Sequence, residues 1–80
     1  MTQDELLAAV KDTICTELGL PADNIGMATK LENMDIDSLD VLRLAASFEK
    51  RFKVTISTVE LTEIQSVGDI VTGLQRKLIA

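Results

Sequence analysis

Residues 35–52 read DIDSLDVLRLAASFEKRF, an acidic hexapeptide followed by apolar residues at helical spacing. Asp37 or Ser38 can cap the N-terminus of a helix, and Asp40 falls in the first turn, where the helix dipole favours a negative charge. The stretch therefore predicts a helix from about Ser38 to Phe52 that begins with a hydroxyl among three carboxylates. Its predicted apolar face consists of Leu39, Leu42, Ala45, Ala46, Phe48 and Phe52.

A capping box precedes the first predicted helix, because Thr2 is followed three residues later by Glu5. Apolar residues then recur every three or four positions and predict a helix over about residues 3–18. Gly19 at the C-terminal cap and Pro21 just beyond it end this helix. The apolar positions that define it are Leu7, Val10, Ile14 and Leu18.

No helical period is sustained from Leu20 to Asp37. Single apolar residues are nevertheless spread through this stretch, and loops of such length in compact domains are usually functional. We therefore expect a long loop that crosses the bundle and is pinned by four anchors. These anchors are Ile25, Met27, Leu31 and Met34.

The segment after Phe52 predicts an extended connection and a short helix. Val54 and Ile56 alternate with polar residues, but nothing nearby offers a strand a pairing partner. Ser57 and Glu60 form a second possible capping box, ahead of a short helix that continues to about Ile64.

Ser66 and Asp69 predict the start of a last helix. Gly73 lies inside it, where glycine costs about 1 kcal/mol relative to alanine, and we expect it to relieve crowding against a neighbour or a ligand. The apolar face consists of Val67, Ile70, Val71, Leu74 and Leu78. The predicted fold is an all-α four-helix bundle of three longer helices and one short helix, with a long loop between the first two.

Composition limits what this chain can do. Its 80 residues are 46% hydrophobic and 26% charged, which fits one compact domain over residues 1–80. No histidine is present, so Ser-His and Cys-His catalytic pairs and imidazole metal ligands are excluded. We therefore do not expect an enzyme.

The net charge of −5 opposes nucleic-acid binding, which needs clustered basic residues. Residues 1–40 carry a net charge of −7 and residues 41–80 carry +2. We expect the acidic half to be the docking surface for a basic partner.

The single cysteine, Cys15, can form neither an intramolecular disulfide nor a cysteine metal cluster, so we expect it to pack as a small apolar side chain. The N-terminus lacks the features of a signal peptide, and no apolar run is long enough to span a membrane. These features predict a cytoplasmic monomer without membrane insertion.

The acidic hexapeptide allows three other interpretations. An EF-hand calcium loop starting at Asp35 would need an acceptor in place of Leu39 and a carboxylate in place of Ala46, so no metal site is expected. A phosphatase-like nucleophilic aspartate would need a preceding apolar strand and a far larger scaffold. The plain alternative is that Ser38 only caps its helix.

The sequence resembles the acyl carrier protein family over nearly its whole length. Asp37-Ser38-Leu39 opens the second predicted helix after the long loop, and the apolar spacing from Phe48 through to Val67 matches the family. The resemblance implies that Ser38, flanked by Asp37 and Leu39, is esterified by 4′-phosphopantetheine from coenzyme A. A phosphopantetheinyl transferase makes that bond in the family, and acyl groups then travel as thioesters between acyl-loading, condensing and acyltransferase enzymes.

The residues around Ser38 agree with a serine that is modified by another enzyme. Ser38 has no adjacent base to activate it, so it is suited to be an acceptor in another enzyme's active site. A phosphodiester at that position would lie at the positive end of the second helix, where anions are favoured.

The chain departs from the family pattern in two places. Asp35 stands where the family commonly has glycine, and aspartate tolerates unusual backbone angles better than most residues, so we expect the turn to survive. Arg43, Lys50 and Arg51 lie on a helix that is acidic in carriers of ordinary fatty-acid synthesis. We interpret Lys50 and Arg51 as a solvated face. Asp35, Asp40 and Arg43 are the predicted partner-docking residues, and Arg43 is expected to disfavour the general fatty-acid enzymes.

A cavity for the cargo is predicted between the second helix and the last two, with close packing of the core as the alternative. Its predicted lining consists of Leu42, Ala46, Ile56, Leu61, Ile64, Ile70 and Gly73. The favoured function is a carrier of acyl thioesters for fatty-acid, specialised-lipid or polyketide biosynthesis. A free-standing peptidyl carrier, or a small helical adaptor without a prosthetic group, are the alternatives.

Overall fold

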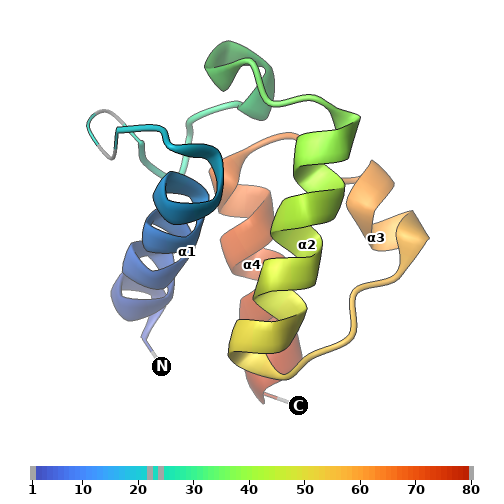
Figure 1. Ribbon diagram of the computed structural model, residues 1–80. Coiled ribbons are helices and arrows are strands. Elements are labelled where there is room, and N and C mark those ends of the chain that lie inside the picture. Colours follow the sequence, from blue (N-terminus) through green and yellow to red (C-terminus); the bar gives the residue numbers. More distant parts are fainter. Residues whose placement is uncertain (1, 22, 24, 80) are drawn as a thin grey trace.

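Helices form most of the computed structural model, which describes residues 2–21, 23 and 25–79. Within those ranges there is no strand, only an isolated antiparallel bridge between Lys30 and Ser66. The predicted all-α fold with three longer helices and one short helix is confirmed (Figure 1). The helices are α1 (Gln3–Leu18), α2 (Ser38–Phe52), α3 (Thr58–Thr62) and α4 (Val67–Ile79).

The first helix has the caps that its sequence predicts. The Thr2 hydroxyl accepts a hydrogen bond from the Glu5 amide at 3.2 Å, and the Thr2 amide donates to the Glu5 carboxylate at 2.9 Å. Gly19 ends α1 in the left-handed conformation at φ 68°.

The predicted cap of α3 is also confirmed, because Ser57 and Glu60 bond reciprocally. The helix ends at Thr62, two residues earlier than the predicted Ile64. Residues 54–57 form the expected extended connection.

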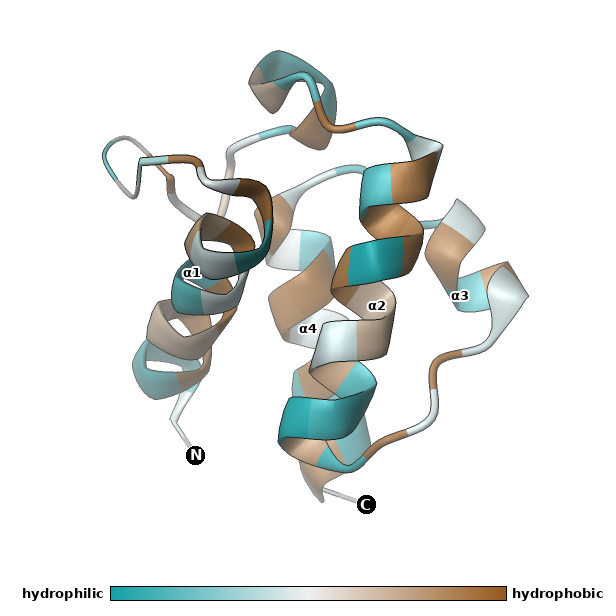
Figure 2. Ribbon diagram, viewed as in Figure 1, coloured by the Kyte–Doolittle hydropathy of each residue, from teal (hydrophilic) through white to brown (hydrophobic). Residues whose placement is uncertain are grey.

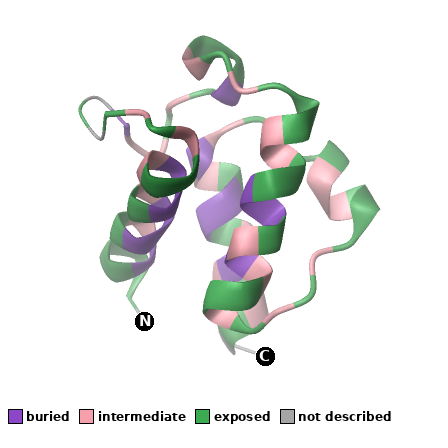
Figure 3. Ribbon diagram, viewed as in Figure 1, coloured by how far each residue is buried: buried purple, intermediate pink, exposed green. Residues whose placement is uncertain are grey.

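The core lies where α1, α2 and α4 meet. In Figure 1, α1 runs opposite in direction to α2 and α4, while α3 lies to one side of α2. The buried residues of these helices face one another, as the purple segments of Figure 3 show. Two loop residues join the same cluster. Its members are Leu6, Val10, Ile14, Ile25, Leu31, Leu44, Phe48, Val67, Ile70, Val71 and Leu74.

The predicted apolar face of α2 is only partly correct. Ala45 and Phe48 are buried, but the core is completed by Leu44, which the prediction omitted. Leu39, Leu42 and Ala46 are exposed, so their assignment to the buried face is wrong. The reason is that α2 carries apolar residues on two opposite sides, and periodicity alone does not say which side a neighbour covers.

The buried face of α1 is likewise displaced. Val10 and Ile14 are buried as predicted, whereas Leu7 and Leu18 are only partly buried. Their places are taken by Leu6, Ala9 and Thr13.

Arg51 is exposed in the last turn of α2, as predicted, but it also connects α2 to α1, which the sequence did not predict. Its Nη1 donates to the carboxylate of Asp12 and to the hydroxyl of Thr13, each at 2.9 Å, and to the Ala9 carbonyl at 3.3 Å. The Thr13 hydroxyl itself donates to the Ala9 carbonyl at 2.9 Å. These bonds explain how the polar side chain of Thr13 can be buried in this interface.

The long loop is anchored as predicted. Ile25 and Leu31 are buried, while Met27 and Met34 are partly buried and pack on the core. The sequence did not predict that residues Leu31–Met34 form a 3₁₀ helix, η1.

Backbone hydrogen bonds fasten this loop to the start of α4. The Leu31 amide donates to the Gln65 carbonyl at 3.0 Å, and the Val67 amide donates to the Thr29 carbonyl at 2.9 Å. A third bond, from the Gly68 amide to the Met27 carbonyl, measures 2.8 Å. These backbone contacts cannot be predicted from the spacing of apolar side chains.

Gly68 and Gly73 have opposite surroundings. A Cβ atom added at Gly68 would lie 2.6 Å from the Met27 carbonyl oxygen, whereas one added at Gly73 would meet nothing within 4 Å. The expected crowding of Gly73 against a neighbour is therefore wrong, and the close backbone approach occurs at Gly68.

Alanine substitutions at the two glycines should separate these surroundings. Gly68→Ala should lower the free energy of unfolding by about 1–3 kcal/mol, because the backbone must move to admit the methyl group. Gly73→Ala should raise it by up to about 1 kcal/mol through helix propensity. Urea unfolding followed by circular dichroism measures both, and equal effects would contradict the close approach at Gly68.

Candidate functional site

Ser38 is the first residue of α2, and its neighbours in sequence form the cap. The Asp40 amide donates to the Asp37 carboxylate at 2.9 Å, and the Asp37 amide lies 3.4 Å from the Asp40 carboxylate. Asp37 is therefore the N-cap residue of a complete capping box. The plain alternative, in which Ser38 serves as the cap, is wrong.

The Ser38 side chain is exposed to solvent. No hydrogen bond or ion pair engages its hydroxyl in the described part of the chain, and the sequence contains no histidine to act as its base. The backbone amides of Ser38 and Leu39 also lack partners among the described residues. Such amides at a helix N-terminus are suited to interact with an anion.

Asp35 makes the turn that brings the chain from η1 into α2. It adopts the left-handed conformation, at φ 57° and ψ 33°, and its amide donates to the Glu32 carbonyl at 3.3 Å. The next residue, Ile36, is partly buried and packs against the core. The expectation that the turn survives aspartate in place of glycine is confirmed.

One of two neighbouring cavities lies beside this turn. The Ser38 cavity, of about 650 Å³, is bounded by Ser38, the first turns of α2, α3 and the loop residues around Lys30. The α4 cavity, of about 440 Å³, lies between α2, α3 and α4. Four apolar side chains line both cavities: Leu31, Val41, Leu61 and Ile64.

Most of the predicted cargo-lining residues border the α4 cavity. Five of the seven line it, namely Ile56, Leu61, Ile64, Ile70 and Gly73. Leu42 lines the Ser38 cavity instead, and Ala46 lines neither of the two. Sequence reasoning missed Val41, Leu44 and Phe48, although their spacing is that of a single helix face.

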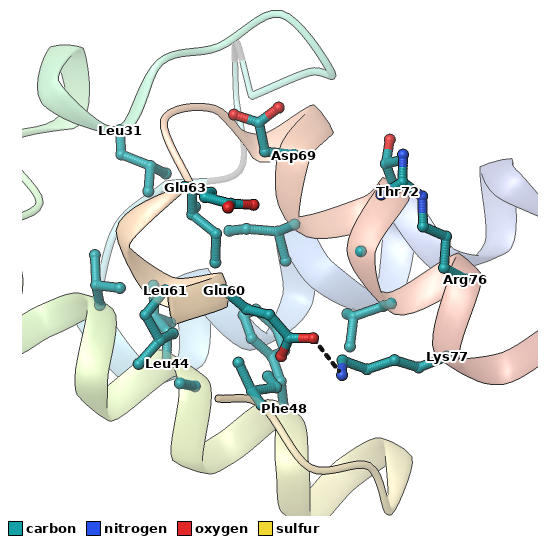
Figure 4. Close-up of a pocket in the computed structure, with 17 residues that line it drawn as sticks. Leu31, Leu44, Phe48, Glu60, Leu61, Glu63, Asp69, Thr72, Arg76 and Lys77 are labelled. Atoms are coloured by element: carbon teal, nitrogen blue, oxygen red, sulfur yellow. Dashed lines mark hydrogen bonds and ion pairs between the residues drawn. The ribbon is translucent and has the colours of Figure 1, made fainter. Parts of the chain in front are cut away.

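Charged groups border the α4 cavity on the side of α3 and α4. Lys77 Nζ lies 2.8 Å from Glu60 Oε1, as the dashed line in Figure 4 marks. The other carboxylate oxygen of Glu60 accepts from the Ser57 amide at 2.8 Å. The hydrogen bond from Lys77, followed by that from Ser57, lowers the pKa of Glu60 below its ordinary value.

The exposed side of α2 is apolar and basic. Leu39, Leu42, Arg43, Ala46 and Lys50 are all exposed and recur at spacings of three and four. We call this set the α2 stripe; Figure 2 shows hydrophobic and hydrophilic segments following one another along α2.

The predicted docking residues differ in their exposure and in their contacts with neighbouring charged groups. Arg43 is 61% exposed and only 4.0 Å from Asp40, whose carboxylate also takes part in the cap. Asp35 is exposed beside Ser38, in the turn before α2.

Comparison with known proteins identifies the family. A family profile described as a phosphopantetheine attachment site matches residues 8–74. The acyl carrier protein of Petrotoga mobilis is 38% identical over 79 residues, which cover 98% of this chain and 93% of the relative. The chain belongs to the acyl carrier protein family.

Further relatives agree in sequence and in fold. The acyl carrier protein of Thermotoga maritima is 33% identical over 78 residues, covering 96% of each chain. The crystal structure of an acyl carrier protein from Thermotoga maritima superposes with a TM-score of 0.88 at 23% identity, covering 96% of this chain and 91% of that one. That likeness confirms the predicted fold.

The family's cofactor is phosphopantetheine, and the residues at the start of α2 fit it. An exposed hydroxyl next to two amides, none of which has a partner among the described residues, offers both a point of attachment and a favourable place for a phosphate. Members of the family act as carriers that work with biosynthetic enzymes. No described helix is long and apolar enough to cross a membrane, and no group of three or more metal-ligating side chains occurs in the described ranges.

The left-handed turn at Asp35 can be tested by substitution. Asp35→Gly should leave the free energy of unfolding unchanged or raise it, because glycine adopts φ 57° without a Cβ clash. Asp35→Val should lower it by about 1–2 kcal/mol, because β-branched residues are strained there. Chemical denaturation measures both changes, and an Asp35→Val variant as stable as wild type would contradict the turn.

Proposed function

We propose that Ser38 is the attachment site of 4′-phosphopantetheine and that this protein carries acyl groups as thioesters. The observation that carries the proposal is the exposed Ser38 hydroxyl at the start of α2, which has no partner in the described part of the chain and lies inside the segment that matches the attachment-site family. When bound, the group supplies a thiol on a long arm. Asp37 and Leu39 flank the serine. Asp37 caps α2, and Leu39 presents an apolar side chain that is 69% exposed.

The protein's own residues do not catalyse the attachment. Ser38 lacks a base, and the carboxylates of Asp37 and Asp40 are engaged with backbone amides. The serine is therefore a substrate for a phosphopantetheinyl transferase, which must bring the base and the metal. The carrier itself is not an enzyme, and we propose that it works in the cytoplasm as a single-domain monomer over residues 1–80.

The α4 cavity is the proposed place for the acyl chain. Its wall includes apolar side chains from the three helices that surround it, such as Leu44, Leu61 and Ile70, and it shares four of its lining side chains with the cavity at Ser38. An apolar chain that leaves the arm near Ser38 can thus enter the bundle along a continuous apolar surface.

Replacement of Ser38 by alanine should abolish the modification. Wild-type protein incubated with coenzyme A, magnesium and a broad-specificity phosphopantetheinyl transferase should gain the mass of one phosphopantetheine, whereas Ser38→Ala should gain none. Because Asp37 rather than Ser38 caps α2, the far-ultraviolet circular dichroism of the variant should be unchanged.

Ser47→Ala is the matched control, since Ser47 lies on the same helix, and it should label normally. Labelling of Ser38→Ala would refute the site. A wild-type protein that gains no mass would favour the helical adaptor, and loading of the holo protein with aminoacyl groups alone would favour a peptidyl carrier.

The partners are acyl-loading, condensing and acyltransferase enzymes, and the α2 stripe is where we expect them to discriminate. Asp35 and Asp40 place negative charge beside Ser38, while Arg43 adds an exposed positive charge in the second turn. A partner with a basic docking surface meets repulsion at Arg43, which slows its association.

Reversal of the Arg43 charge should speed the acylation of the carrier by such partners. Arg43→Glu should raise the rate of acylation by a basic acyl-loading enzyme of fatty-acid synthesis roughly 2- to 10-fold at low ionic strength. Lys50→Glu should have a smaller effect, because Lys50 lies about 10 Å further from Ser38 along the helix axis than Arg43 does. The gain should shrink as salt is added, and equal rates for wild type and Arg43→Glu at low salt would contradict a selective role.

A further inference from the structure

Helix α3 is the least anchored helix of the bundle. None of its five residues is buried, and its cap is formed with its own neighbour Ser57. In the described part of the chain, the single side-chain bond from α3 to another helix is the ion pair between Glu60 and Lys77 of α4. The position of α3 over the α4 cavity therefore depends on this pair and on apolar contacts.

The ion pair lies at the end of the α4 cavity that is farther from Ser38. The cavity follows α4 from Asp69 to Lys77, which is about 12 Å along the helix axis. The Asp69 end is joined to the Ser38 side, because the Asp69 carboxylate accepts from the amide of Gln65, a residue that lines the Ser38 cavity. Figure 4 shows Asp69 and Lys77 well apart on α4, with Glu60 reaching across from α3 to Lys77.

Charged side chains line both ends of the α4 cavity, Glu63 and Asp69 at the near end and Glu60 and Lys77 at the far end, but in the described part of the chain only the far pair bridges α3 and α4. A chain entering from Ser38 first meets apolar side chains that both cavities share, such as Val41 and Leu61. At the far end it meets a carboxylate and an ammonium group, which lose hydration if an apolar chain is pressed against them. A methylene that lies against the shared apolar side chains is favourable to enclose, whereas one pressed against the ion pair is not.

We propose that the Glu60–Lys77 ion pair limits the length of acyl chain that the α4 cavity encloses, by holding α3 against α4 and closing the far end of the cavity. Glu60 and Lys77 are then specificity-determining residues of the carrier. This inference rests on the proposed function, because it presupposes an acyl group attached through Ser38.

The chemistry of Glu60 allows the pair to be removed without unfolding α3. One carboxylate oxygen bonds to Lys77 and the other accepts from the Ser57 amide. Glutamine at position 60 keeps an acceptor for the Ser57 amide, so Glu60→Gln removes the ion pair and preserves the capping box. Lys77→Met removes the charge and keeps an apolar stem of similar length.

The test uses holo protein loaded with saturated acyl chains from butyryl to palmitoyl, with the melting temperature of each species measured against the unacylated holo form. Each methylene that the folded protein encloses should raise the melting temperature by about 3–6 °C. In wild type the gain should stop at one chain length. In Glu60→Gln and Lys77→Met it should continue to longer chains.

Two controls make the comparison specific. Asp12→Asn removes an ion pair of similar length, Arg51 to Asp12 at 2.9 Å, on the side of α1, and its gain should stop at the same chain length as in wild type. Lys77→Arg keeps the pair and should also behave as wild type.

The outcomes separate this inference from the carrier function. If the gain stops at the same chain length in all variants, the ion pair does not set the limit and the inference is refuted. If no chain raises the melting temperature of wild type, the cavity does not hold the cargo and the inference is refuted as well, while the mass gained at Ser38 still supports the carrier function.

Discussion

The fold depends on one close approach between backbones, the contact of the Met27 carbonyl with Gly68 at the start of α4. A 2.8 Å hydrogen bond joins them, and there is no room for a Cβ atom on Gly68. Together with the bridge between Lys30 and Ser66, this contact fastens the long loop to α4. The loop in turn places η1 and the left-handed Asp35, which set the point where α2 begins. The position of Ser38 thus follows from contacts of residues far from it in sequence.

At the start of α2, Asp37 and Asp40 form the cap, and the Ser38 hydroxyl takes no part in it. Asp37 and Asp40 satisfy each other's amides, so the serine hydroxyl is left without a partner among the described residues. A hydroxyl that acted as the cap would be held by the backbone and less open to another enzyme. The same carboxylates also place negative charge near the start of α2, and Arg43 offsets part of it one turn later.

The bundle is firmly joined on one side and loosely joined on the other. Arg51 ties α2 to α1 through three acceptors, and the three long helices share the buried core. Helix α3 contributes no buried residue and borders both cavities. A carrier has to shelter an apolar cargo and release it again, so a bundle with one weakly held wall suits that task better than a uniformly packed core.

The sequence by itself determined the helices and the place of the candidate attachment residue at a helix start, because these follow from local chemistry. Capping boxes at Thr2 and Ser57, the left-handed Gly19 and the Asp37-Ser38-Leu39 triplet all act within a few residues, and each of these local features occurs. The tertiary structure alone decided which side of α2 is buried, because Leu39, Leu42 and Ala46 satisfy a helical period as well as Leu44, Ala45 and Phe48 do. It also decided that Gly68 rather than Gly73 is the crowded glycine, and that Glu60 meets Lys77. These pairings join residues distant in sequence, and periodicity records the spacing within one helix but not the identity of the neighbour that covers it.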